Sequence, residues 1–175
     1  MTNEVLKAIE NRRSCKAFRP EQIKPEELDA ILKAGTFAPT GRNKQAPIIL
    51  AVTNKEIRDQ LSKINAGKDP YFRVDPFYNA PCVLVVLADK SVPTYLYDGS
   101  LVMENMLRAA HSLGLGACWI HRAKETFETE EGKALLKELG IEGDYEGIGN
   151  CVVGYANVVS TEDKPRRANR VYYVK

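Results

Sequence analysis

The stretch RRSCKAFR, residues 12–19, concentrates charge near the N-terminus. It holds four cations, one serine and one cysteine, and no acid: the cations are Arg12, Arg13, Lys16 and Arg19. Bidentate arginine, a lysine point charge and a short hydroxyl donor such as Ser14 are the groups that recognise phosphate. Cations that follow a helix end also complement the helix dipole, so a solvated helix terminus is the alternative interpretation.

A second basic cluster lies near the C-terminus, in DKPRRANR. Its cations are Lys164, Arg166, Arg167 and Arg170. By itself the cluster is equally typical of a solvated tail. If the fold brings the two clusters together, they would neutralise a dianion.

The loop APTGRNKQAP, residues 38–47, is rich in hydrogen-bonding groups. Thr40, Asn43 and Gln45 lie within six positions of one another. Amides donate and accept hydrogen bonds, which suits a flat heterocycle that presents both kinds of edge. An ordinary turn loop is the alternative.

Other motifs favour less specific chemistry. GLGACWI, residues 114–120, partly matches the glycine-rich fingerprint of dinucleotide-binding folds. A tryptophan occupies the place of the third glycine, and the motif precedes a strand instead of a helix, so a dinucleotide-binding loop is rejected. Trp119 could be core or could line a pocket. Cys118 and His121 form C-x-x-H, but without further ligands or an orienting group neither a metal site nor a thiol nucleophile is favoured. His111 is interpreted as a core or interface histidine.

The elements that position these groups follow from apolar periodicity. It predicts helices at 2–11, 25–35, 55–64, 95–113 and 129–139, and strands at 48–52, 82–88, 116–120 and 151–155. A strand-like piece at 171–174 could pair outside its own domain. Two successive helices at the start indicate an α+β fold. The helix at 95–113 is apolar nearly all round, so we expect it to be central or at a subunit contact.

Composition narrows the class of protein. The chain has 175 residues, 44% of them hydrophobic, which suits one globular domain. A net charge of +2 argues against nucleic acid or an anionic membrane as the main partner. Four cysteines without C-x-x-C spacing, and no apolar region at the N-terminus, favour a cytoplasmic protein with free thiols.

Four stretches in register resemble the FMN-dependent nitroreductase family over nearly the whole chain. RRSCKAF is similar to the family's R-x-S-x-[RK] motif, and APTGRNKQAP to its P-[ST]-x-x-N-x-Q segment. GLGACWI resembles the strand that follows the central helix, and KPRR resembles the basic motif near the C-terminus.

The resemblance implies a three-layer α/β/α sandwich with a mixed, mainly antiparallel sheet. Residues 1–175 would form one FMN-binding domain in an intertwined homodimer, and the C-terminal extension, about 160–175, would wrap the partner. The implied phosphate and ribityl contacts are Arg12, Arg13, Ser14, Lys16, Lys164 and Arg166. The other subunit would present Pro39, Thr40 and Asn43 to the isoalloxazine. The backbone of Trp119, Ile120 and His121 would lie by flavin N5.

The implied reaction is ping-pong hydride transfer. NADH or NADPH would reduce the flavin, and a small electron-poor acceptor, such as a nitroarene or quinone, would then take its place. Because the cofactor carries the chemistry, we expect no catalytic side chain and no metal. A flavin-binding storage or transfer module and a nucleotide-binding regulatory protein are the alternatives.

Two departures from the family pattern concern the pocket. Gln45-Ala46-Pro47 replaces the usual Gln-Pro-Trp, and only residues 89–94 remain where longer members carry helical insertions. Substrate selection would then be loose, or would depend on aromatic residues that could equally be core: Tyr71, Phe72, Phe77 and Tyr78. Within the basic run, we expect Cys15 and Phe18 to face the core and Arg19 to be a solvated charge.

Overall fold

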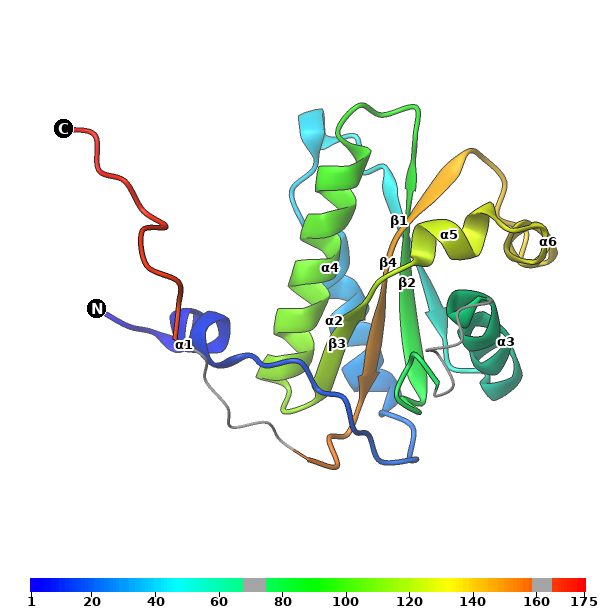
Figure 1. The fold of residues 1–175 in the computed structure, drawn as a ribbon, viewed down its shortest axis with the longest axis horizontal. Helices are drawn as coiled ribbons and strands as arrows, with labels where there is room; N and C mark the ends of the chain where they lie inside the picture. The colour runs from blue at the N-terminus through cyan, green and yellow to red at the C-terminus, as the bar shows by residue number, and fades with distance from the viewer. Residues whose placement is uncertain (68–74, 159–164) are drawn as a thin grey trace.

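One antiparallel sheet of four strands organises the chain. The computed structural model describes residues 1–67, 75–158 and 165–175. The strands lie in the order β1 (Pro47–Val52), β2 (Cys82–Asp89), β4 (Tyr145–Gly154) and β3 (Gly116–Ile120). Each neighbouring pair is antiparallel. β1 and β3 are therefore the two edges of the sheet (Figure 1).

Helices pack against both faces of this sheet (Figure 1). Leu84 and Val86 of β2 share a core cluster with Met103 and Met106 of α4 (Tyr95–Ser112). On that face α4 packs beside α2 (Pro25–Thr36). Alternate strand residues point to opposite faces. The other face therefore buries a second cluster, with residues from three helices: α3 (Lys55–Ala66), α5 (Ala123–Glu128) and α6 (Glu130–Glu138).

Caps and glycines set the helix ends where the sequence predicts them. The Asn54 side chain accepts a hydrogen bond from Ile57 N at 3.0 Å and begins α3. Thr129 begins α6 by accepting one from Gly132 N at 2.9 Å. Gly114, just after α4, adopts a φ of +76°, a backbone conformation that glycine accommodates without steric cost.

The structure differs from the sequence expectations in two elements, β4 and α5. β4 begins at Tyr145 instead of 151, because Gly147, Gly149 and Asn150 disguise the strand pattern. Gly147 is required by packing, since a Cβ there would lie 2.3 Å from Ala123 O. α5 was not expected as a helix. Residues 171–174 are exposed and pair with no strand of the described chain, so their pairing with another chain stays a prediction.

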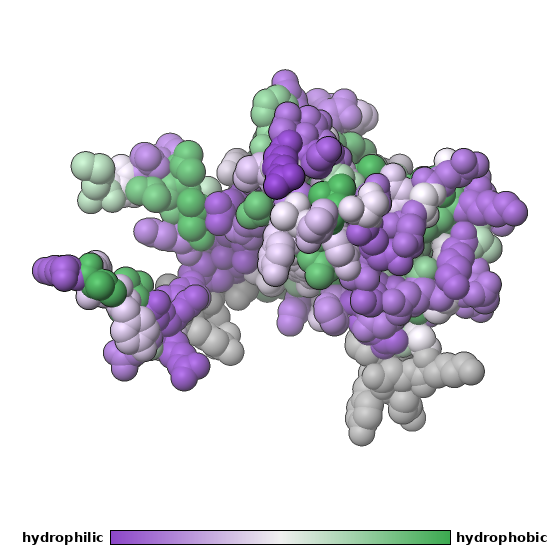
Figure 2. All heavy atoms as spheres, turned by 90° about the horizontal axis from the view of Figure 1, so that it is seen from above, coloured by the Kyte–Doolittle hydropathy of each residue, from purple (hydrophilic) through white to green (hydrophobic). Residues whose placement is uncertain are grey.

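Two apolar surfaces project from this core. α1 (Glu4–Asn11) buries none of its residues, and Val5 is 67% exposed. The C-terminal arm, residues 165–175, extends away from the sheet and ends near Val171–Val174, where Tyr173 is 85% exposed (Figure 1). Hydrophobic side chains are visible on both projections in Figure 2. No helix in the described ranges is long and apolar enough to cross a membrane.

Candidate functional site

The basic run lies along the outer edge of β3. Ser14 forms a parallel bridge with Ala117, and Cys15 N donates to Ala117 O at 2.9 Å. Cys15 packs against Gly116, where a Cβ would lie 2.7 Å from the Cys15 sulfur. Because an extended segment alternates its side chains, burial of Cys15 leaves Ser14 and Lys16 on the outer side.

The expected placement of Cys15, Phe18 and Arg19 agrees with the structure. Cys15 is 7% exposed and Phe18 is 9% exposed, which confirms that both face the core. The side chain of Arg19 is 57% exposed and lies 3.6 Å from a Glu21 carboxylate oxygen, as expected for a solvated charge.

A cavity of about 410 Å³ brings two predicted stretches together. Lys16 lines it with the edge of β3 and the turn that follows, from Cys118 to Arg122. The Lys16 ammonium lies 5.9 Å from the centre of the Tyr78 ring, which lines the same cavity. The cavity therefore places a cation beside Trp119, Ile120 and His121.

Burial governs the thiol on this cavity. Cys118 is 5% exposed, and burial raises its pKa despite a hydrogen bond to Ser14 and the nearby charges of Lys16 and Arg12. A raised pKa disfavours the thiolate, the form in which cysteine acts as a nucleophile. Cys118 therefore contributes an uncharged thiol to the cavity wall. Arg12, Ser14 and Lys16 are near enough to this thiol to influence its pKa.

α3 holds the turn after β3. Asn65, which is 2% exposed, donates from Nδ2 to His121 O at 3.0 Å and to Thr126 Oγ1 at 3.3 Å. Arg122 adopts a left-handed φ of +72°, and its Nη1 donates to Ala66 O at 3.3 Å. Neither Asn65 nor Arg122 stands out in the sequence, because no local pattern reports contacts between residues 56 positions apart.

An ion pair supports the segment that carries Tyr78. The Asp75 carboxylate accepts hydrogen bonds from Arg58, from Ser62 Oγ at 2.5 Å and from Phe77 N at 3.0 Å. Burial would raise the pKa of Asp75, but these donors outweigh it and lower the pKa below its ordinary value. Phe77 is core at 1% exposed, Tyr78 lines the cavity, and Tyr71 and Phe72 lie outside the described residues.

Arg13 lies away from this cavity. Its Nη1 donates to Glu10 O at 2.6 Å and to Arg12 O at 2.9 Å, so it covers the end of α1. It lines a smaller space of about 220 Å³ together with Ser14 and His111. Its predicted cofactor contact stays a prediction.

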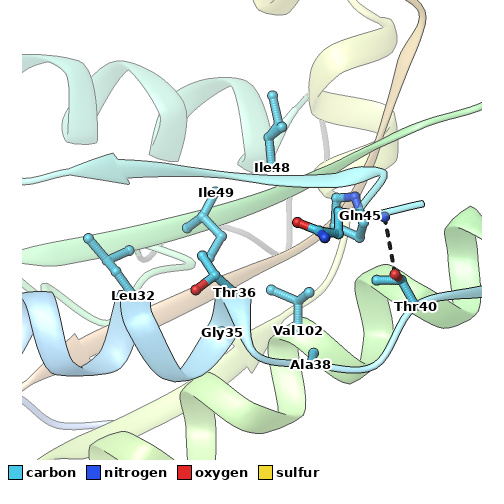
Figure 3. Close-up of a pocket in the computed structure, with 10 residues that line it drawn as sticks. Leu32, Gly35, Thr36, Ala38, Thr40, Gln45, Ile48, Ile49 and Val102 are labelled. Carbon is cyan, nitrogen blue, oxygen red and sulfur yellow. Dashed lines mark hydrogen bonds between the residues drawn. The ribbon is translucent and has the colours of Figure 1, made fainter. Parts of the chain in front are cut away.

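The amide-rich loop lies at the opposite edge of the sheet, just before β1. Thr40 Oγ1 accepts from Gln45 N at 3.1 Å, and Asn43 Oδ1 accepts from Gln45 Nε2 at 3.2 Å. A cavity of about 360 Å³ opens between this loop, β1 and α2, with apolar walls that include Leu32, Ile49 and Val102 (Figure 3). Because β2 and β4 separate the two edges, Pro39, Thr40 and Asn43 do not meet Lys16 within one chain.

The C-terminal cations are only partly described. Arg166 is exposed at the start of the arm, and Lys164 lies outside the described residues. Their predicted approach to the Arg12 run therefore stays a prediction.

Comparison with known proteins identifies the fold and the family. Residues 9–155 match the sequence pattern of the nitroreductase family. A nitroreductase with bound FMN from Bacteroides fragilis superposes with a TM-score of 0.92 at 29% identity, over 99% of this chain and 100% of that chain. Another with bound FMN, from Desulfitobacterium hafniense, gives 0.89 at 30% identity and covers 100% of both chains.

Relatives named for an activity match a smaller share of the chain. A protein of Archaeoglobus fulgidus, provisionally named NADH dehydrogenase/NAD(P)H nitroreductase, is 33% identical over 78% of this chain and 75% of its own length. An FMN reductase (NADPH) of Bacillus subtilis is 29% identical over 67% of this chain, which spans 54% of that longer protein. Because the family pattern matches most of its length, the chain belongs to the nitroreductase family.

Proposed function

We propose that the chain is an FMN-dependent NAD(P)H oxidoreductase that works as a homodimer, with each cofactor site shared between two copies. The enzyme class and cofactors are those named for its relatives. The observation that carries the shared site is the separation of its parts. One chain places Arg12, Ser14 and Lys16 at the β3 edge and the Thr40 loop at the β1 edge.

The residues at the β3 edge fit FMN. Lys16 and Arg12 supply positive charge for a phosphate, and Ser14 supplies a hydroxyl donor beside them. The neighbouring cavity of about 410 Å³ has a wall of Pro76, Tyr78 and Ile120 that suits a flat ring. The proposed contacts are Arg12, Arg13, Ser14, Lys16, Trp119, Ile120, His121, Lys164 and Arg166 from one copy, with Pro39, Thr40 and Asn43 from the other.

The exposed apolar surfaces support the dimer. α1 and the tip of the C-terminal arm each expose apolar side chains that no part of the described chain covers. In our proposal the arm, about residues 160–175, wraps the partner, and its Val171–Val174 segment adds to the partner's sheet. The β1 edge with its apolar cavity is the acceptor we favour (Figure 3). This addition would complete a mixed sheet within a three-layer sandwich.

The protein contributes binding and orientation to the reaction. A bound FMN would supply the chemistry of hydride transfer from NADH or NADPH to an electron-poor acceptor such as a nitroarene or quinone. The turn at His121, held by Asn65, orients the main chain beside the ring. Donor and acceptor would use the same space in turn, which gives ping-pong kinetics. No described side chain needs to act as a general acid.

Spectroscopy and rapid kinetics test the activity. Purified protein, or protein incubated with FMN, is expected to show a flavin spectrum that NADH or NADPH bleaches and a nitroarene or quinone restores. A protein that stays colourless with FMN would contradict the proposal. A yellow protein that is slow with every acceptor would instead be a flavin storage or transfer module.

Mixed dimers test the shared site. One variant carries Arg12→Ala and Lys16→Ala at the β3 edge, and the other carries Thr40→Ala and Asn43→Ala at the β1 edge. Each alone is expected to be inactive. Co-expression is expected to recover about a quarter of the wild-type activity, because random pairing makes about half of the dimers mixed and each mixed dimer has one intact site of two. A mixture that stays inactive would place the whole site within one chain.

A further inference from the structure

The turn Thr40–Gln45 stores backbone strain. Arg42, Asn43 and Gln45 have φ values of +52°, +52° and +50°, and none of them is glycine. Left-handed backbone of this kind is disfavoured for residues with a Cβ, least so for asparagine, and it persists where surrounding contacts impose it. Such strain in a short segment is typical of a ligand-binding or switch element.

Buried contacts impose this conformation. Asp98 at the start of α4 is 3% exposed; its Oδ1 accepts from Gly41 N at 3.0 Å and its Oδ2 from Thr94 Oγ1 at 2.9 Å. A Cβ on Gly41 would lie 2.3 Å from Thr94 Oγ1, so the turn is pressed against the β2–α4 connection. At its other end, Thr40 Oγ1 holds Gln45 N. The turn is thus fixed before any ligand arrives.

The strained turn divides its side chains between two cavities. Thr40 and Gln45 line the apolar cavity beside β1 (Figure 3). Arg42 and Lys44 line a separate cavity of about 430 Å³ whose opposite wall is Ser91–Thr94. This second cavity occupies the region of the short connection at residues 89–94.

The charge of the second cavity is positive. Neither Arg42 nor Lys44 has an acidic partner within 4.0 Å among the described residues. The acids nearby are engaged: Asp89 accepts from Ser91 N at 2.8 Å, and Asp144 pairs with Lys90 at 2.6 Å. Asp98 is buried under its two donors. A guanidinium and an ammonium therefore remain available to one anionic group.

We infer that Arg42 and Lys44 form a subsite for an anionic substituent of the small molecules that reach the flavin. The inference rests on the proposed function only for its location, since the Thr40 loop is there placed beside the partner copy's flavin. Two sources have the required chemistry: a carboxylate on the electron acceptor and the 2′-phosphate of NADPH. Arginine binds either group with two parallel hydrogen bonds, and lysine adds a point charge.

Titration calorimetry tests the subsite without relying on turnover. If the protein binds FMN, it is first saturated with FMN. One pair of titrations compares 4-nitrobenzoate with neutral 4-nitrobenzamide. The other pair compares adenosine 2′,5′-bisphosphate with adenosine 5′-phosphate. Wild type is expected to prefer the first member of at least one pair. The double variant Arg42→Gln/Lys44→Gln is expected to lose that preference by about tenfold, the effect of one charge-assisted contact.

A variant matched in charge controls for long-range electrostatics. Lys133→Gln/Lys137→Gln removes two exposed cations from α6, remote from the turn, and is expected to bind both pairs like wild type. Loss of the nitrobenzoate preference alone assigns the subsite to the acceptor, and loss of the bisphosphate preference alone assigns it to NADPH.

Two results would overturn the inference: equal binding of anionic and neutral probes by wild type, or equal losses in the two double variants. A protein that neither binds FMN nor oxidises NAD(P)H would contradict the proposed function instead, and these titrations would still decide the subsite.

In an active enzyme the same variants give a second measurement. Arg42→Gln/Lys44→Gln is expected to raise KM for the anionic substrate while kcat is nearly unchanged, because the contact is present before and during hydride transfer. Circular dichroism of this variant checks that the two substitutions have not unfolded the chain.

Discussion

The two edges of the sheet carry different halves of the site. At the β3 edge, main-chain pairing with Ala117, the buried Cys15 and the amide of Asn65 hold the basic run and the His121 turn in place. At the β1 edge, a strained polar turn stands over a cavity that the chain leaves open (Figure 3). The β3 edge is held in place by contacts within one chain, whereas the β1 edge leaves a cavity open to a group from outside the chain.

This difference indicates how the work is divided. An edge that must grip a phosphate benefits from groups fixed by the core, because preorganised donors lose little entropy on binding. An edge that must accept another chain or a changing substrate has to remain accessible. Variants at the two edges should therefore fail in different ways.

The largest effect is expected from the β3 edge. Arg12→Ala/Lys16→Ala removes two charge-assisted contacts to the proposed phosphate, so FMN affinity is expected to fall by about a thousandfold, or about 4 kcal/mol. Quenching of FMN fluorescence on titration measures it. Unfolding by urea should be nearly unchanged, because both side chains lie outside the core. If this variant binds FMN as tightly as wild type does, the β3 edge is not part of the cofactor site.

Asp75 tests the support beneath the same edge. Asp75→Asn removes one of the two carboxylates of the described chain that pair with Arg58, which is only 8% exposed, and leaves Asp59 at 3.1 Å. The free energy of unfolding is expected to fall by about 2 kcal/mol, because a hydrogen-bonded ion pair is lost while one partner charge remains. Because the folded-state pKa of Asp75 lies below its ordinary value of 3.8, its stabilisation is present above that pH and is lost as the pH falls below about 4. Urea unfolding of wild type from pH 7 to pH 3 should show this loss, and the variant should show less of it.

Asn65 tests the turn by itself. Asn65→Leu keeps the size of the side chain but leaves His121 O without its donor, so the turn loosens and kcat is expected to fall about tenfold, with FMN still bound. Asn54→Ala on the same helix is the control: it removes the cap and about 1 kcal/mol of stability, without changing kcat. Equal effects on kcat in both variants would reduce Asn65 to a structural role.

Arg19 gives the smallest expected effect. It belongs to the same basic run, but its side chain points to solvent near Glu21. Arg19→Ala is expected to change FMN affinity less than about twofold, since exposed ion pairs contribute little. A loss as large as that of Arg12→Ala/Lys16→Ala would mean that net charge, and not position along β3, governs binding.

Local patterns predicted most of the fold. The buried run of β2, the helix starts near residues 55 and 129 and the helix end before Gly114 each depend on signals within a few residues, so the sequence alone identifies them. β4 was predicted too short, because its glycines are set by packing and not by strand propensity. A Cβ on Gly147 would clash with α5, and one on Gly149 would clash with the Trp119 ring. α5 is short, and its burial depends on packing against β4.

The candidate site shows the same division between local features and long-range contacts. The sequence by itself determined the groups and their spacing: the cations and hydroxyl of the basic run, the amide-rich loop and the family to which they belong. Only the tertiary structure decided that Lys16 meets His121 on one cavity, that Asn65 holds the turn, and that the loop lies at the other edge. Residue types and spacings are local properties, whereas strand order and long-range contacts arise only when the whole chain packs.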